Sequence, residues 1–178
     1  MLLHTKILST SALANLKHIV SFSEIHAVNV VSLEKDVLHC SLATCVSTVF
    51  GGFSAQGIWL GANHIVDARN PEHSAAKEIH LVIDQLKSRN CHSLFLLGVF
   101  GGLPQDARRG YNLDFTLEYL DSLGFSAYID IRQTTALGCG FYFDIYSLLP
   151  GIISISVWPS KNAQGIRPPA FELEPIFI

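Results

Sequence analysis

Residues 72–102, EHSAAKEIHLVIDQLKSRNCHSLFLLGVFGG, contain the clearest helix of this chain, followed directly by a buried strand. Apolar residues recur at helical spacing from Ala76 to Leu86, and charged residues fill most of the remaining positions. The run from Ser93 to Phe100 is almost entirely apolar and ends at Gly101-Gly102, where we expect a close backbone approach. A helix beside such a strand indicates a core built from both α and β elements.

The segments on either side extend this pattern to an α+β fold in one domain spanning residues 1–178. The run Cys45 to Phe50 fits either a strand or the first turn of a helix. The tail at 159–178 contains several prolines and is expected to be irregular, although its last residues are apolar enough to pack back. Helices are expected at 11–19, 72–88 and 112–123, and strands at 25–31, 37–42, 58–62, 93–100, 125–131, 140–145 and 152–158.

Composition excludes several classes of function. Hydrophobic residues make up 49% of the chain and charged residues 15%, yet no apolar run is long enough to span a bilayer. The net charge of −3 gives no basic surface for nucleic acid. The N-terminal segment lacks a signal-peptide pattern, and the cysteines show no zinc-ribbon spacing, so we expect reduced thiols in the cytoplasm.

Cys45 and His64 are the candidate catalytic residues. Cys45 follows the short turn Ser41-Leu-Ala-Thr, which is typical of a chain that presents a thiol at the start of its next element. His64 ends the strand-like run that begins at Gly57. A cysteine and a histidine on neighbouring strands are the minimum for nucleophilic catalysis by a thiol.

Each of these residues also has an ordinary structural interpretation. An isolated cysteine more often serves as a small core residue, and a histidine after an apolar strand often only ends it. His73 and His80 lie on the expected helix, but zinc would require more ligands at tighter spacing, so no metal site is expected. The order of the segments decides between these interpretations.

That order resembles the CheD family of chemoreceptor glutamine deamidases, and through it the catalytic domains of deamidating toxins such as cytotoxic necrotizing factor. The resemblance runs from about residue 25 to about residue 157, and four stretches carry it. These are Ser41-Leu-Ala-Thr-Cys45-Val, Gly61-Ala-Asn-His64, the helix and strand from Glu78 to Gly102, and the helix from Asn112 to Gly124. The family implies a β-sandwich of mixed sheets flanked by helices.

The resemblance also implies roles for individual residues. Cys45 would be the nucleophile and His64 its base, while backbone N–H groups at Thr44 and Cys45 would hold the oxyanion. The family's threonine six positions before the nucleophile is replaced by His39, and a shifted register would offer Ser41 instead. His39, Ser41 or a main-chain carbonyl is therefore expected to orient the imidazole.

The implied activity is hydrolysis of a protein glutamine to glutamate with release of ammonia, without a metal or an organic cofactor. The expected partner is a protein with a reactive glutamine, either a chemoreceptor or, if the chain is exported as an effector, a host protein. No contact with nucleic acid or membrane is expected. The alternatives are an inactive CheD-like scaffold domain and a thiol amidase acting on small substrates.

Overall fold

Helices and strands are interspersed along this chain in the computed structural model, which describes residues 8–22, 28–43, 45–101, 107–129, 140–161, 165 and 169–178. The elements in order are α1 (Thr10–Ala14), β1 (His18–Phe22), β2 (Asn29–Ser32), β3 (Asp36–Leu42), β4 (Val46–Ser54), β5 (Gly57–Ala62), α2 (Ala75–Ser88), β6 (His92–Gly101), α3 (Ala107–Ser122), β7 (Phe141–Tyr146), β8 (Ile152–Pro159) and β9 (Phe171–Phe177). The α+β class expected from the sequence is confirmed.

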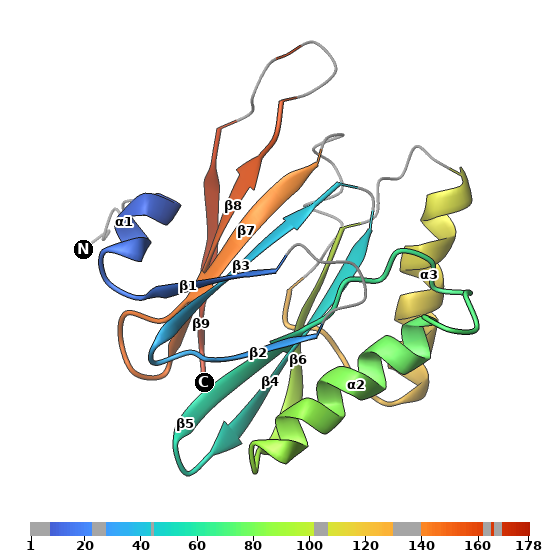
Figure 1. The fold of residues 1–178 in the computed structure, drawn as a ribbon, viewed down its shortest axis with the longest axis horizontal. Coiled ribbons are helices and arrows are strands. Elements are labelled where there is room, and N and C mark those ends of the chain that lie inside the picture. Colours follow the sequence, from blue (N-terminus) through green and yellow to red (C-terminus); the bar gives the residue numbers. More distant parts are fainter. Residues whose placement is uncertain are drawn as a thin grey trace.

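Two sheets form the body of the protein (Figure 1). The five-stranded sheet has the order β1-β3-β7-β8-β9 and is mixed, because β1 runs parallel to β3 while its other neighbours pair antiparallel. The four-stranded sheet, β2-β5-β4-β6, is antiparallel throughout. Apolar side chains from both sheets form one buried cluster between them, where Phe100 stacks on Phe143 with ring centroids 4.3 Å apart.

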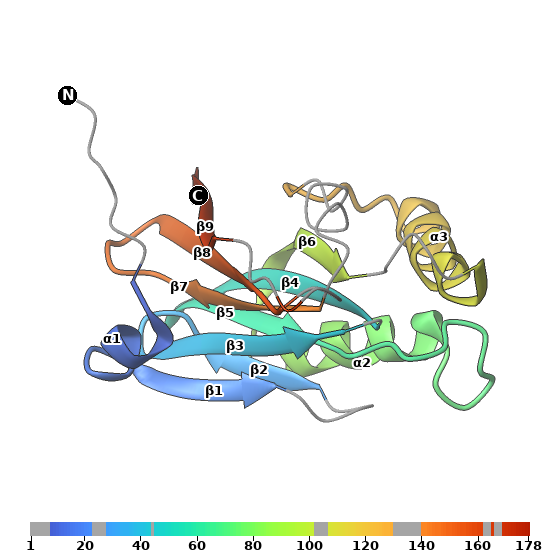
Figure 2. The same cartoon turned by 90° about the horizontal axis from the view of Figure 1, so that it is seen from above.

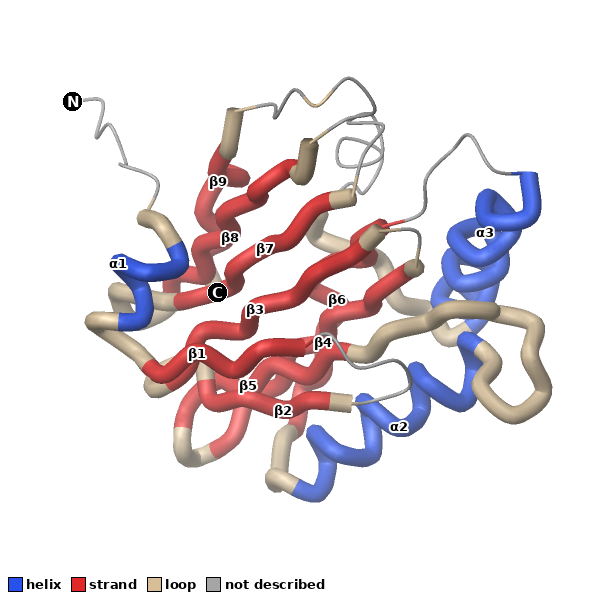
Figure 3. Tube along the Cα trace, turned by 45° about the horizontal axis from the view of Figure 1, so that its top comes forward, coloured by secondary structure: helices blue, strands red, loops and turns tan. Residues whose placement is uncertain are grey.

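The helices cover the outer faces of this pair of sheets. Ile79 and Val82 of α2 and Leu120 of α3 pack with Val46 and Phe50 of β4, on the face of the four-stranded sheet that points away from the other sheet. On the opposite side of the molecule, Leu13 of α1 packs with residues of the five-stranded sheet. Figures 2 and 3 show α1 on one side of the sheets and α2 and α3 on the other.

Local sequence explains the ends of the main helices. Ser74 caps α2, accepting a hydrogen bond from the Lys77 amide at 3.4 Å, so the helix begins at Ala75 rather than at Glu72. The helix α3 ends before Gly124, which adopts φ +76°, as expected for a C-terminal glycine. No helix among the described residues is long and apolar enough to cross a membrane.

The structure corrects three expectations about secondary structure. The helix expected at 11–19 ends at Ala14, and from His18 the chain forms β1, which pairs with β3. The tail at 159–178 is not irregular throughout, since Phe171–Phe177 form β9, which pairs with β8 and is the outermost strand on that side of the sheet. In the expected strand 125–131, Ile129 makes only an isolated bridge to Gly98, and residues 130–131 lie outside the described part.

Candidate active site

Cys45 stands immediately before β4, where the chain passes from one sheet to the other. The sequence allowed either a strand or a helix from Cys45 to Phe50, and in the structure Val46–Ser54 form the strand β4. The Val46 amide donates to the Ile65 carbonyl at 2.9 Å, and the Ile65 amide donates to the Val46 carbonyl at 2.7 Å. Because a strand follows, Cys45 is not the first residue of a helix. The Val46 amide already donates its hydrogen bond to Ile65. Thr44, the other expected oxyanion donor, lies outside the described residues.

The strand register places His64 on the same face as Cys45. Val46 pairs with Ile65 and Val49 with Ala62, so Ser47 lies directly opposite His64. Cys45 is two residues from Ser47 along the strand and therefore a diagonal neighbour of His64, at a Cα separation of about 7–8 Å for such pairs. His64 is 6% exposed, whereas Cys45 is partly exposed and packs against the cluster between the sheets.

Two more polar side chains, Cys40 from the five-stranded sheet and Ser47 from the four-stranded sheet, point into the space between the sheets. Cys40 of β3 is fully buried, and burial raises the pKa of its thiol to about 12. The Ser47 hydroxyl acts in the opposite direction on that pKa, and the nearby Cys45 raises it further. Cys40, Cys45, Ser47 and His64 therefore form a small sulfur, hydroxyl and imidazole cluster at one end of the inter-sheet core.

Gly101 holds the backbone of Cys45 at close range. It has φ +104°, and a Cβ at this position would collide with the Cys45 carbonyl oxygen. Val46 pairs with Gly101 in the β4–β6 ladder, which brings the end of β6 to the cysteine. The close backbone approach expected at Gly101-Gly102 is confirmed for Gly101, while Gly102 lies outside the described residues.

Buried amides fix the segment that carries His64. The side-chain oxygen of Asn63 accepts from the amide of Thr48 at 2.8 Å and from its hydroxyl at 2.9 Å. After His64, Asn112 of α3 donates to the Val66 carbonyl at 2.6 Å and accepts from the Ala68 amide at 2.9 Å. These positioning contacts were missed from the sequence, because they join residues that are distant along the chain.

His39 and Ser41 lie on the other face of β3. Strand alternation points Cys40 into the inter-sheet core and its two neighbours outward. There the Nδ1 atom of His39 lies 2.7 Å from the fully buried carboxylate of Asp144, which also accepts from Thr10 at 2.9 Å and from Trp158 at 3.1 Å. The structure thus does not bring His39 or Ser41 to Cys45 and His64.

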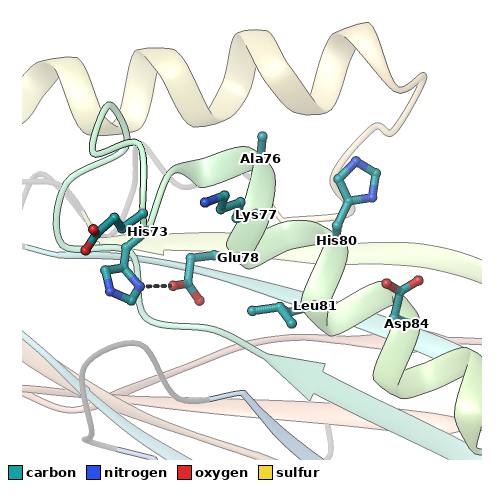
Figure 4. A pocket seen from close by; sticks show the side chains of 8 residues that line it. His73, Ala76, Lys77, Glu78, His80, Leu81 and Asp84 are labelled. Carbon is teal, nitrogen blue, oxygen red and sulfur yellow. Dashed lines mark ion pairs between the residues drawn. The ribbon is translucent and has the colours of Figure 1, made fainter.

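The side chains of the expected helix at 72–88 line a hollow of about 420 Å³ on the surface of α2 (Figure 4). His73 lies 3.5 Å from the Glu78 carboxylate, whereas His80 is hydrogen-bonded to the Tyr119 hydroxyl at 2.7 Å. The two histidines therefore contact different partners. Because α2 covers the opposite face of the four-stranded sheet, this hollow is separate from the Cys45 cluster.

The Cys45 cluster places a thiol and an imidazole on one face in apolar surroundings, and these are the two side-chain types that nucleophilic catalysis by a cysteine requires. Among the described residues, no group of three or more histidine, cysteine or carboxylate side chains could hold a metal ion. The sequence matches no model of a known protein family and no curated protein.

Proposed function

We propose that this protein is a cysteine-dependent, CheD-like protein glutamine deamidase. The observation that carries the proposal is the placement of Cys45, just before β4, and His64, just after β5, as diagonal neighbours on one face. The two packed sheets with helices on their outer faces agree with the sandwich that the CheD resemblance implies. Its substrate would be a glutamine on a chemoreceptor or, for an exported effector, on a host protein.

The reaction follows from the chemistry of this pair. The Cys45 sulfur attacks the side-chain carbonyl carbon of the glutamine, and its proton passes to His64. The tetrahedral oxyanion would accept hydrogen bonds from backbone amides at the turn that ends at Cys45, whereas the Val46 amide is already bound to the Ile65 carbonyl. His64 then protonates the departing ammonia, and water activated by the same imidazole releases glutamate from the thioester.

Orientation of the imidazole is assigned to groups on the inner face. His39 and Ser41 project from the outer face of β3, and His39 is engaged by Asp144. The two inner-face candidates are a main-chain carbonyl and the Ser47 hydroxyl, which lies opposite His64 in the ladder. Either would fix the imidazole tautomer as the third member of a catalytic triad does.

An inactive scaffold domain is the second candidate, and the burial of His64 favours it. A residue only 6% exposed contacts a substrate only if the glutamine side chain enters beside Cys45. A scaffold would bind the same protein target but leave its glutamine unchanged.

Ammonia release from a panel of glutamine-bearing proteins tests the proposal, with mass spectrometry locating the converted residue. Cys45→Ser should abolish release, and His64→Ala should slow it by about 10²–10⁴-fold, the usual contribution of a general acid–base. His39→Ala is the matched control, because it removes an imidazole from the opposite face of β3 and should leave the rate nearly unchanged. A Cys45→Ser variant as active as the parent would exclude the thiol mechanism.

A further inference from the structure

Cys40 and Cys45 lie in the same buried region although their strands belong to different sheets. Cys40 points inward from β3, and Cys45 packs against the same inter-sheet cluster just before β4. Only four residues separate the two cysteines in sequence, and both side chains contribute to or pack against the same buried cluster. Both are thiols in the structure.

The two thiols differ in access to solvent. Cys40 is fully buried, while Cys45 is partly exposed. An oxidant arriving from solvent therefore meets Cys45 first, and Cys40 lies behind it in the core. This arrangement of an accessible thiol backed by a second thiol is the one that redox-sensing cysteines use.

We propose that Cys40 is the resolving thiol of a redox switch that reversibly blocks Cys45. A hydroperoxide would convert Cys45 to its sulfenic acid, and Cys40 would then close a disulfide across the two sheets. This regulation rests on the proposed function to the extent that Cys45 is the reactive nucleophile of the protein. The signal is a hydroperoxide, and a small dithiol reverses the block.

Each step balances in atoms and electrons. The Cys45 thiolate attacks the terminal oxygen of the hydroperoxide, the O–O bond breaks, and an alkoxide or hydroxide leaves and takes a proton from water. The Cys40 sulfur then attacks the Cys45 sulfur, forming the S–S bond while the S–O bond breaks. The Cys40 proton leaves with the hydroxyl group as water. A dithiol reductant reverses the block by thiol–disulfide exchange.

Cys91 provides an internal control. It is also buried, but it belongs to the cluster between the four-stranded sheet and the helices, on the opposite face from Cys45. A Cβ on Gly52 would collide with the Cys91 side chain, which places Cys91 near the far end of β4. Cys91 should therefore take no part in the disulfide.

The experiment treats the reduced full chain with hydrogen peroxide, blocks the remaining thiols by alkylation, and maps the peptides by mass. Trypsin releases residues 36–69 with Cys40 and Cys45 on one peptide, and chymotrypsin can then cut after Leu42 between them. We expect an unalkylated peptide two hydrogens lighter than the reduced form, whose chymotryptic halves separate only after reduction. Alkylation of Cys40 together with sulfinic or sulfonic acid at Cys45 in the parent would overturn the proposal.

Two variants make the result specific. With Cys40→Ala, Cys45 should proceed to sulfinic and sulfonic acid that dithiol does not reverse, whereas Cys91→Ala should form the disulfide as the parent does. Equal irreversible oxidation of Cys45 in the parent and in Cys40→Ala would count against a resolving role. Because the readout is mass, a disulfide that forms in a protein without deamidase activity would refute only the proposed function.

Discussion

At the scale of single residues, the cysteines differ in environment more than in sequence context. Cys45 is partly exposed, whereas Cys40 and Cys91 are buried, and burial raises the pKa of both buried thiols. Since the thiolate is the reactive form, iodoacetamide near neutral pH should label Cys45 first. Chymotryptic mapping after brief treatment resolves these sites and Cys139, which lies outside the described residues, and equal labelling of all four cysteines would contradict an activated nucleophile.

Gly101 is the second residue whose effect can be predicted. An alanine there would adopt an unfavourable φ and collide with the Cys45 carbonyl, so the backbone at the candidate nucleophile must shift. Gly101→Ala should lower the free energy of unfolding by about 1–3 kcal/mol and alter the alkylation rate of Cys45. Urea unfolding measures the first effect.

Gly124→Ala is the matched control for Gly101→Ala. Gly124 also has positive φ, but nothing lies within 4 Å of the added Cβ. Gly124→Ala should therefore lower the free energy of unfolding through backbone strain alone, and it should leave the alkylation rate of Cys45 unchanged. If both variants altered Cys45 labelling equally, the contact between Gly101 and Cys45 would have no special role.

At the scale of elements, the end of β5 is held by a side chain. Asn63→Ala would leave the amide and hydroxyl of Thr48 without their acceptor in a fully buried place. We expect a loss of about 1–3 kcal/mol in unfolding free energy, and a lower rate of ammonia release because His64 follows directly. Thr48→Val removes only the hydroxyl and should cost less; a larger loss from Thr48→Val would contradict this account.

Elements with a strong local pattern were predicted well, whereas elements made by distant pairing were not. The periodic face of α2 and the apolar run of β6 are visible in the sequence, and both elements form near their expected bounds. The last two residues of the helix expected at 11–19 instead begin β1, because β3 supplies their partner. β9 forms in a proline-containing tail because its outer position on the sheet tolerates a residue without an N–H.

At the scale of the whole molecule, the faces of the sheets decide which candidate residues can act together. Cys45 and His64 were chosen from the sequence, but their shared face depends on a ladder that sequence spacing does not specify. The outward direction of His39 and Ser41 follows from strand alternation around Cys40, once Cys40 is assigned to the core. Asp144, the partner of His39, comes from a strand more than a hundred residues away.

Two buried, weakly acidic side chains in the five-stranded sheet, the thiol of Cys40 and the phenol of Tyr146, also predict how stability depends on pH. Burial raises the pKa of Cys40 from 9.0 to about 12 and that of Tyr146 from 10.0 to about 12. Because each folded pKa lies above its unfolded value, the stabilisation is complete below the unfolded pKa and is lost as pH rises toward the folded one. The free energy of unfolding should therefore fall between about pH 9 and about pH 12.

Urea unfolding across this range, with a reductant present, measures the predicted slope. Together, Cys40 and Tyr146 should account for a loss of unfolding free energy on the order of a few kcal/mol across this pH range, since one unit of pKa shift corresponds to ~1.4 kcal/mol. Cys40→Ala and Tyr146→Phe should each flatten the alkaline decline. Tyr146→Phe should also lower stability near neutral pH, because it removes hydrogen bonds of the tyrosine hydroxyl with Ser156 and Glu172. An alkaline decline as steep in both variants as in the parent would show that other groups control it.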